Sequence, residues 1–268
     1  MTKLNSYFVL FISFILFSCS SDNENIGDSS NFSTPLNLGN YWTYNVESQG
    51  NITRDSLFVD SETTINNNTY KIFKTRDDVA SGFYSSALRN NKVRENNGKL
   101  LLTGDLAIAA NQTLPITLDL TLNDFIIFDK NASNNQALNT NPRTGTINET
   151  INSYPLSINY SLQTFGGENF TTFTSPDGTV YSDVKSTKIK LNVNITTEIT
   201  VLGATQTITA LAPQDVLIAT LYIANGIGVV YTNTITTYSI SSFIANELSV
   251  PETDTQTQDE FLDTYSVN

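Results

Sequence analysis

The sequence predicts an all-β protein, built on a single strongly curved antiparallel sheet or open half-barrel with a short C-terminal helix. Two observations predict this fold. Apolar and polar residues alternate with a period of two in several long segments, which places one face of a strand in the core and the other in water. The 268-residue chain also contains 12 Tyr and 15 Phe beside many Thr, and aromatic and β-branched side chains favour strands.

The alternation is clearest in residues 114–122, 154–162 and 189–201. In the last of these segments Ile, Leu and Val alternate with Lys, Asn, Thr and Glu, which is typical of an antiparallel sheet with one wet face. A strand over 188–201 would be far longer than the usual length of about five or six residues. Strands of this length predict a large curved sheet or a barrel wall.

Turn residues divide the rest of the chain into predicted hairpins. Asn66 and Asn67 tolerate left-handed backbone, so they predict a turn between strands at 56–64 and 69–75. A second hairpin is expected to join 85–89 to 92–94.

Later in the chain, Asn225-Gly226 predicts a turn between strands at 216–223 and 229–240. The Asn-rich segment 129–145 predicts a long surface loop. Because no clear linker interrupts residues 35–250, we expect them to form one domain. The pattern changes after residue 240. Residues 241–248 predict one or two helical turns, and 251–268 predict a tail with a short helix that runs to about Tyr265.

The N-terminus has the pattern of a secretory signal. Lys3 precedes an apolar run over residues 7–17 that is too short for a stable membrane span. Leu16-Phe17-Ser18-Cys19 is similar to the lipobox of bacterial lipoproteins, so residues 1–18 are expected to be removed and Cys19 to be lipidated. A buried free thiol is the alternative for this cysteine. Residues 19–34 are polar and predict a flexible tether.

Composition excludes several classes of function. Lys3 is the only charged residue of the predicted signal, so the mature chain would carry 13 basic and 26 acidic residues and a net charge of −13. This charge argues against nucleic-acid binding. The chain has no histidine, which excludes Ser-His-Asp catalysis and His-ligated metal sites. Its single cysteine excludes an internal disulfide, and no cofactor is predicted.

Acidic residues leave two chemistries open. A pair of carboxylates could hydrolyse glycosides, and the candidates are Asp77, Asp78, Asp105, Asp119, Asp124 and Glu168. Solvated acids on a negative surface are the alternative reading. Calcium needs only oxygen ligands, but no spaced-acid loop occurs. Asp22, Glu24 and Asp28 lie in the tether, and Asp177-Gly178 is better explained as a turn, so no metal site is predicted.

The aromatic residues near position 42 are candidates for sugar binding. Tyr41, Trp42 and Tyr44, with Phe83 and Tyr84, could stack on pyranose rings, whereas core packing is the alternative. Tyr41 and Trp42 are neighbours on one predicted strand and therefore face opposite ways, so one of them is expected to be more exposed.

Asp55-Ser56-Leu57 resembles a three-residue O-glycosylation motif of exported Bacteroidetes proteins, with Ser56 as the acceptor. Alternatively, Leu57 simply starts a strand.

Three stretches together carry a wider resemblance: the lipobox with Ser21-Asp22-Asn23-Glu24, the opening 38–44, and the late segment 224–231. The chain resembles uncharacterised lipoproteins of Bacteroidetes, especially flavobacteria. The resemblance implies a curved antiparallel sheet similar to the half-barrels of periplasmic lipoprotein carriers. The acids after Cys19 resemble a surface-export signal, which implies an outer-membrane protein on the cell surface or the periplasmic face.

The function expected from these patterns is that of a non-enzymatic binding or scaffold module. The lipid bilayer is the expected partner through acylated Cys19. The second partner would be a glycan, an apolar molecule in the concavity of the sheet, or another envelope protein. The alternatives are a carboxylate-dependent polysaccharide hydrolase and a calcium-dependent adhesion module.

Overall fold

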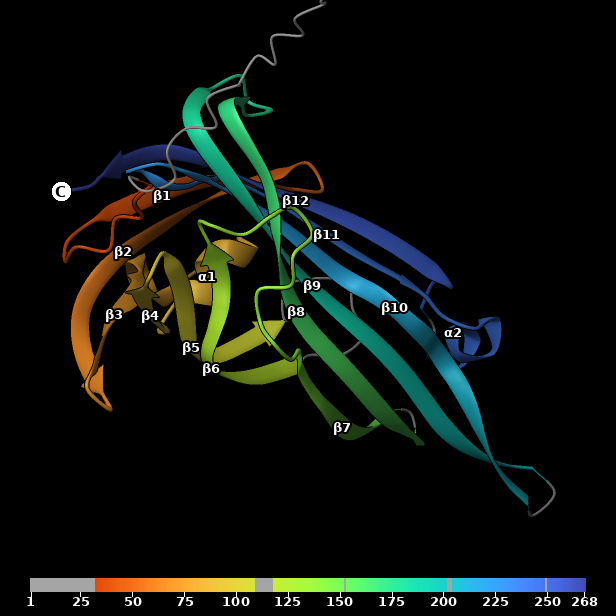
Figure 1. Cartoon of the computed structure of the whole chain (residues 1–268). Coiled ribbons are helices and arrows are strands. Elements are labelled where there is room, and N and C mark those ends of the chain that lie inside the picture. Colours follow the sequence, from red (N-terminus) through yellow and green to blue (C-terminus); the bar gives the residue numbers. More distant parts are fainter. Residues whose placement is uncertain (1–31, 109–117, 152, 202–203, 249) are drawn as a thin grey trace, which may run out of the picture.

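The computed structural model describes residues 32–108, 118–151, 153–201, 204–248 and 250–268, and Figure 1 shows their arrangement. These residues form one antiparallel sheet of twelve strands, which confirms the predicted fold class. The strands are β1 (Tyr41–Ser48), β2 (Asn51–Ile65), β3 (Asn68–Thr75), β4 (Lys92–Asn96), β5 (Lys99–Ile108), β6 (Leu118–Asp129), β7 (Arg143–Ile151), β8 (Tyr154–Thr174), β9 (Val180–Val201), β10 (Ala204–Ala224), β11 (Gly228–Ser239) and β12 (Thr253–Ser266).

The order of the strands turns the sheet into a nearly closed barrel. Every two consecutive strands are neighbours except β6 and β7, and β12 returns to lie between β1 and β11. The two edges of the sheet are therefore β6 and β7, which follow one another in the chain, and the seam of the barrel lies where β6 approaches β8 and β9.

Side chains bridge this seam where backbone pairing stops. Asn139, in the predicted long loop, accepts a hydrogen bond from the backbone N–H of Ile126 at 2.9 Å and donates to its carbonyl at 3.0 Å. The Asn139 amide thus makes the two hydrogen bonds that the backbone of a neighbouring strand would otherwise make. Thr187 of β9 donates to the carbonyl of Ile127 at 3.0 Å. These contacts satisfy edge groups of β6 that would otherwise attract another chain.

The turns predicted at Asn66-Asn67 and at Asn225-Gly226 are confirmed. Asn66 and Asn67 have φ angles of 48° and 63° in the turn between β2 and β3. Asn225 and Gly226 lie between β10 and β11, and Gly226 has a φ of 71°.

Gly228, just after that turn, has a φ of 106°, and a Cβ at this position would lie 3.2 Å from the indole nitrogen of Trp42. Both conditions favour glycine.

Two secondary-structure predictions are wrong. Residues 85–89 do not form a strand, because α1 (Phe83–Leu88) occupies this segment and buries Phe83, Ala87 and Leu88. Residues 253–266 form β12 rather than a tail with a helix. The helical turns predicted at 241–248 are confirmed by α2 (Ser242–Leu248). The predicted strand at 114–122 is seen from Leu118 onward, and its first four residues lie outside the described part.

Both errors have one physical cause. The inward positions of β12 include Gln258 and Glu260, which are buried but polar, so the segment lacks apolar alternation. These side chains are inward because they bind the start of α1. The helix and the strand therefore depend on each other, across about 175 residues of sequence, for their polar partners.

Among the described residues, a large cluster of apolar side chains lies in the barrel interior. α1 lies inside the curved sheet, with its apolar face against strands from both sides (Figure 1). Two interior spaces, which border α1 or its neighbours, measure about 20 and 30 Å³. Each is large enough for about one water molecule, so neither can hold an acyl chain.

Candidate ligand groove

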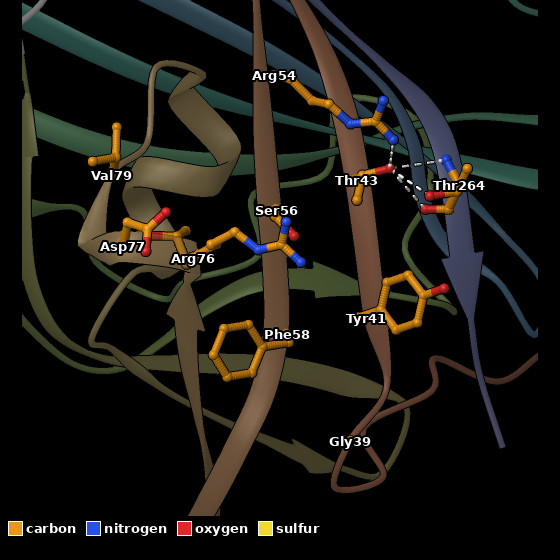
Figure 2. A pocket seen from close by; sticks show the side chains of 11 residues that line it. Gly39, Tyr41, Thr43, Arg54, Ser56, Phe58, Arg76, Asp77, Val79 and Thr264 are labelled. Carbon is orange, nitrogen blue, oxygen red and sulfur yellow. Dashed lines mark hydrogen bonds between the residues drawn. The ribbon is translucent and has the colours of Figure 1, made fainter.

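A concavity lies on the outer wall of the barrel, over β1 and β2 (Figure 2). Its volume is about 1360 Å³. Drug-sized ligands occupy pockets of roughly 300–1,000 Å³, so the groove has room for an extended molecule. The lining residues are Gly39, Tyr41, Thr43, Arg54, Ser56, Phe58, Thr75, Arg76, Asp77, Val79 and Thr264.

The floor of the groove follows from strand alternation. Outward residues of β1 lie opposite outward residues of β2, so that Tyr41 pairs with Phe58 and Thr43 pairs with Ser56. On the other side of β1, Thr43 lies opposite Thr264 of β12, and their hydroxyls are 2.6 Å apart. The floor therefore has a row of two aromatic side chains and a row of hydroxyl side chains, which lie two residues apart along the strands.

The wall is formed by the turn that follows β3. The short 3₁₀ turn η2 (Arg76–Asp78) carries two successive left-handed residues, Asp77 with φ 58° and Asp78 with φ 54°. Each such conformation costs of order 1 kcal/mol or more outside glycine. The neighbouring helix end holds this turn, since Arg89 donates to the Asp78 carbonyl at 2.6 Å and Asn90 to its carboxylate at 2.8 Å.

Two arginines lie over the floor. Arg54 is ion-paired with Asp263 and also donates to the Thr43 hydroxyl at 3.1 Å. Arg76 extends from the wall across β2, with its guanidinium near Ser56 in Figure 2. In the part of the chain that the structure describes, the guanidinium of Arg76 has no ion pair or hydrogen bond. The groove therefore carries an available positive charge in a protein whose net charge is −12.

Beneath the groove, on the inner face of the same strands, polar side chains hold the start of α1. The Asp55 carboxylate accepts hydrogen bonds from the N–H groups of Ser81 and Gly82 at 2.8–3.0 Å. Gln258 accepts from Phe83 N–H at 2.8 Å, and Glu260 from Tyr84 N–H at 2.7 Å. These bonds satisfy helix N–H groups that have no intrahelical partner, and they position the Val79–Gly82 segment behind the groove wall.

Glu260 is fully buried, and this burial raises its pKa to about 8. The N–H groups at the start of α1 act in the opposite direction, whereas the nearby Asp55 raises the pKa further. Glu260 is therefore mainly a neutral acid at pH 7. The two buried carboxyls face Gly82 and the helix start, so a substrate in the groove does not reach them.

The structure separates the three aromatic candidates. Tyr41 is 41% exposed and lies in the groove. Trp42 and Tyr44 are 4% and 1% exposed, and they donate hydrogen bonds inside the barrel to the carbonyls of Ile227 and Val229. The stacking hypothesis is thus corrected for Trp42 and Tyr44, whose rings belong to the core, because even positions of β1 point inward. Phe83 is buried as well, and Tyr84 packs edge-on against Tyr44.

Ser56 lies in the middle of β2, partly buried, with its side chain on the groove floor. Its neighbours Asp55 and Leu57 are buried on the inner face. In the folded strand the Ser56 hydroxyl therefore faces the groove, whereas the other two side chains of the motif, Asp55 and Leu57, face the interior. Glycosylation of Ser56 stays a prediction.

Of the six acids considered for hydrolysis, Asp77 lines the groove. Asp124 forms a bidentate pair with Arg94 at 2.7 and 2.9 Å, and this pair lowers the pKa of Asp124. Asp105 accepts from Thr121 at 2.9 Å on the outer face. The remaining three, Asp78, Asp119 and Glu168, are exposed on η2, β6 and β8. The groove lining thus contains one carboxylate, Asp77.

Among the described residues, no three acidic or cysteine side chains gather in a way that could hold a metal ion. Asp177 accepts from the N–H of Thr179 at 3.0 Å in the turn predicted there. Cys19, Asp22, Glu24 and Asp28 lie outside the described residues.

Sequence reasoning missed Arg76, Phe58, Asp55 and Glu260. Asp55 and Glu260 could have been noticed in the sequence, because each lies two residues before a buried leucine and so shares its inward-facing side of the strand. No sequence pattern indicated Arg76, since its position depends on the η2 turn.

No family model matches the chain, and no curated protein matches it. One solved structure is similar in part: a protein from Parabacteroides distasonis ATCC 8503, described as a "putative lipoprotein". It is 13% identical, the match covers 88% of this chain and 99% of the other, and the TM-score is 0.42. In the described part of the present chain, no helix has the length and apolar character needed to cross a membrane.

Proposed function

We propose that this protein is a lipid-anchored binding module of the bacterial outer membrane, and that the groove on its outer wall binds a glycan. The observation that carries the second part is the Tyr41–Phe58 pair beside the hydroxyl row of Thr43, Ser56 and Thr264. Aromatic faces pack against the C–H faces of sugar rings, and hydroxyls and guanidinium groups exchange hydrogen bonds with sugar hydroxyls.

The location of the groove also favours a glycan. It lies on the solvent side of the sheet, and hydroxyl and charged side chains line it beside aromatic and apolar ones. The interior spaces of about 20 and 30 Å³ do not suit a bulky apolar molecule. The proposal therefore places the ligand outside the barrel and not in the concavity of the sheet.

The anchor rests on the sequence. The apolar run, the lipobox and Cys19 precede a polar segment, which suits a tether between a membrane and the described barrel. Cells that express the chain are expected to incorporate labelled palmitate into it, and Cys19→Ala is expected to abolish the label. Protease treatment of intact cells would show which face of the membrane carries the barrel. Incorporation of label into the Cys19→Ala variant would contradict the anchor.

Tyr41→Ala is expected to weaken glycan binding by up to about tenfold, since a stacked aromatic ring is worth about 0.5–1.5 kcal/mol. The measurement is titration calorimetry of the purified soluble domain against a panel of neutral and acidic hexose oligomers. Because Tyr41 is half exposed, the free energy of unfolding should change little.

Tyr265→Ala is the matched control, because Tyr265 is 44% exposed on the adjacent strand and does not line the groove. This variant should bind as the unmodified protein does. If no oligomer of the panel binds, or if both variants lose affinity equally, the groove is not the glycan site.

A further inference from the structure

We infer that the glycan bound in the groove carries carboxylate groups, and that Arg76 recognises them. This inference rests on the proposed function and names the class of sugar: a polysaccharide containing uronic acid, held with its ring on Tyr41 and Phe58 and its carboxylate on Arg76.

Arg76 differs from every other arginine of the chain. The chain has five, all in described segments. Arg54 and Arg94 bind carboxylates, and Arg89 and Arg143 donate to carbonyl oxygens. Arg76 has no such partner among the described residues. In a chain with 26 acidic residues, an arginine that extends over a groove floor without a carboxylate partner is available for a ligand.

The position of Arg76 is imposed by the backbone. Arg76 immediately follows β3 and precedes the two left-handed aspartates, so the chain turns there and sends the side chain back over the outer face of β2. In Figure 2 the guanidinium of Arg76 projects over β2 near Ser56, and both residues line the groove together with Phe58. Strain held by Arg89 and Asn90 at this turn is of the kind found at ligand-binding sites.

The chemistry of the groove selects a carboxylate. A guanidinium is a planar fork of donors that matches a carboxylate with two parallel hydrogen bonds. The second arginine, Arg54, is already neutralised by Asp263, and Asp77 adds a negative charge to the wall. One available positive charge therefore matches a group with one negative charge better than it matches a doubly charged phosphate.

The aromatic pair indicates that the molecule carrying the carboxylate is a sugar. Tyr41 and Phe58 lie directly opposite each other on neighbouring strands, and the hydroxyls of Thr43 and Ser56 form the next row. A pyranose ring that rests on the aromatic pair places its substituents over these hydroxyls and over Arg76. The groove volume of about 1360 Å³ leaves room for further rings along the chain of the polymer.

The test uses one polymer in two forms: a short oligogalacturonate and its methyl ester, which has the same rings without the charge. The soluble domain is expected to bind the free acid about tenfold more tightly than the ester, as charge-assisted hydrogen bonds allow. Arg76→Gln should weaken the acid about tenfold and leave the affinity for the ester unchanged. Arg76→Lys, which keeps the charge but not the fork, should recover part of the loss.

Arg143→Gln is the matched control, because it removes the same charge from an exposed arginine on β7, away from the groove. It should leave both affinities unchanged. Thermal melts of each variant would show whether folding is intact.

The outcomes separate the two proposals. If acid and ester bind equally and Tyr41→Ala weakens both, the glycan site stands and the carboxylate inference is overturned. If neither form binds and no other oligomer does, the proposed function itself fails. A loss of affinity in Arg143→Gln equal to that in Arg76→Gln would also overturn the inference, since it would reflect net charge and not a site.

Discussion

Deletion of residues 253–268 is expected to prevent the chain from folding. β12 pairs with both β1 and β11, so its loss would open the barrel between its first and last strands. It would also remove Gln258 and Glu260, which hold the start of α1, and the buried Leu262. The purified truncated protein should show no cooperative unfolding transition in circular dichroism, and it should be digested rapidly by protease.

The control is the shorter deletion of residues 267 and 268, which leaves every pair of β12 in place. That variant should unfold cooperatively, with a modest loss of stability. A truncation at residue 252 that keeps a cooperative transition would mean that β12 is an appendage and not a structural member of the barrel.

The second large effect is a loss of stability as pH rises. Burial raises the pKa of Glu260 to about 8, against the ordinary value of 4.5 for a glutamate in the unfolded chain. The folded state therefore holds a proton that the unfolded state releases above pH 4.5. The stability that this group contributes is fully present below pH 4.5, falls as pH rises, and is lost once the pH passes about 8. The difference between the two pKa values corresponds to about 5 kcal/mol.

Glu260→Gln tests this directly. Glutamine has the shape of the neutral acid, and its amide oxygen can accept the Tyr84 N–H that Glu260 accepts at 2.7 Å. Free energies of unfolding from urea titrations at pH 5, 7 and 9 should fall steeply for the unmodified protein and much less for the variant. At pH 9 the variant should be the more stable of the two.

The control for this series is Glu149→Gln, because Glu149 is an exposed acid on the edge strand β7. Its pH dependence should match that of the unmodified protein. Parallel curves for the unmodified protein and Glu260→Gln would show that another group governs the response.

Alternation alone was enough to place the long strands. The patterns at 154–162 and 189–201 correspond to parts of β8 and β9, which form one hairpin of two strands with more than twenty residues each. The same rule predicts that Tyr41 and Trp42 face opposite sides, and the structure exposes Tyr41. Such predictions succeed because, in a strand that borders a core, the polarity of each residue indicates whether its side chain faces the core or the solvent.

Prediction failed where a polar residue is buried by a distant partner. Gln258 and Glu260 are polar at inward positions because they bind N–H groups at the start of α1, about 175 residues earlier in the chain. A local pattern contains no information on that partner. The α1 segment was misassigned for the same reason, since a six-residue helix is not stable by itself and depends on the barrel around it.

The sequence by itself determined the fold class, the long strands, the β2–β3 and β10–β11 turns and the negative charge of the chain, because these depend on composition and on near neighbours. Only the tertiary structure decided which aromatic ring reaches the surface groove together with Phe58, and that Arg76 lines the same groove without a carboxylate partner among the described residues. It also decided that the last strand closes the barrel against the first. These features depend on the register between strands and on a strained turn, and both are selected by packing across the whole barrel.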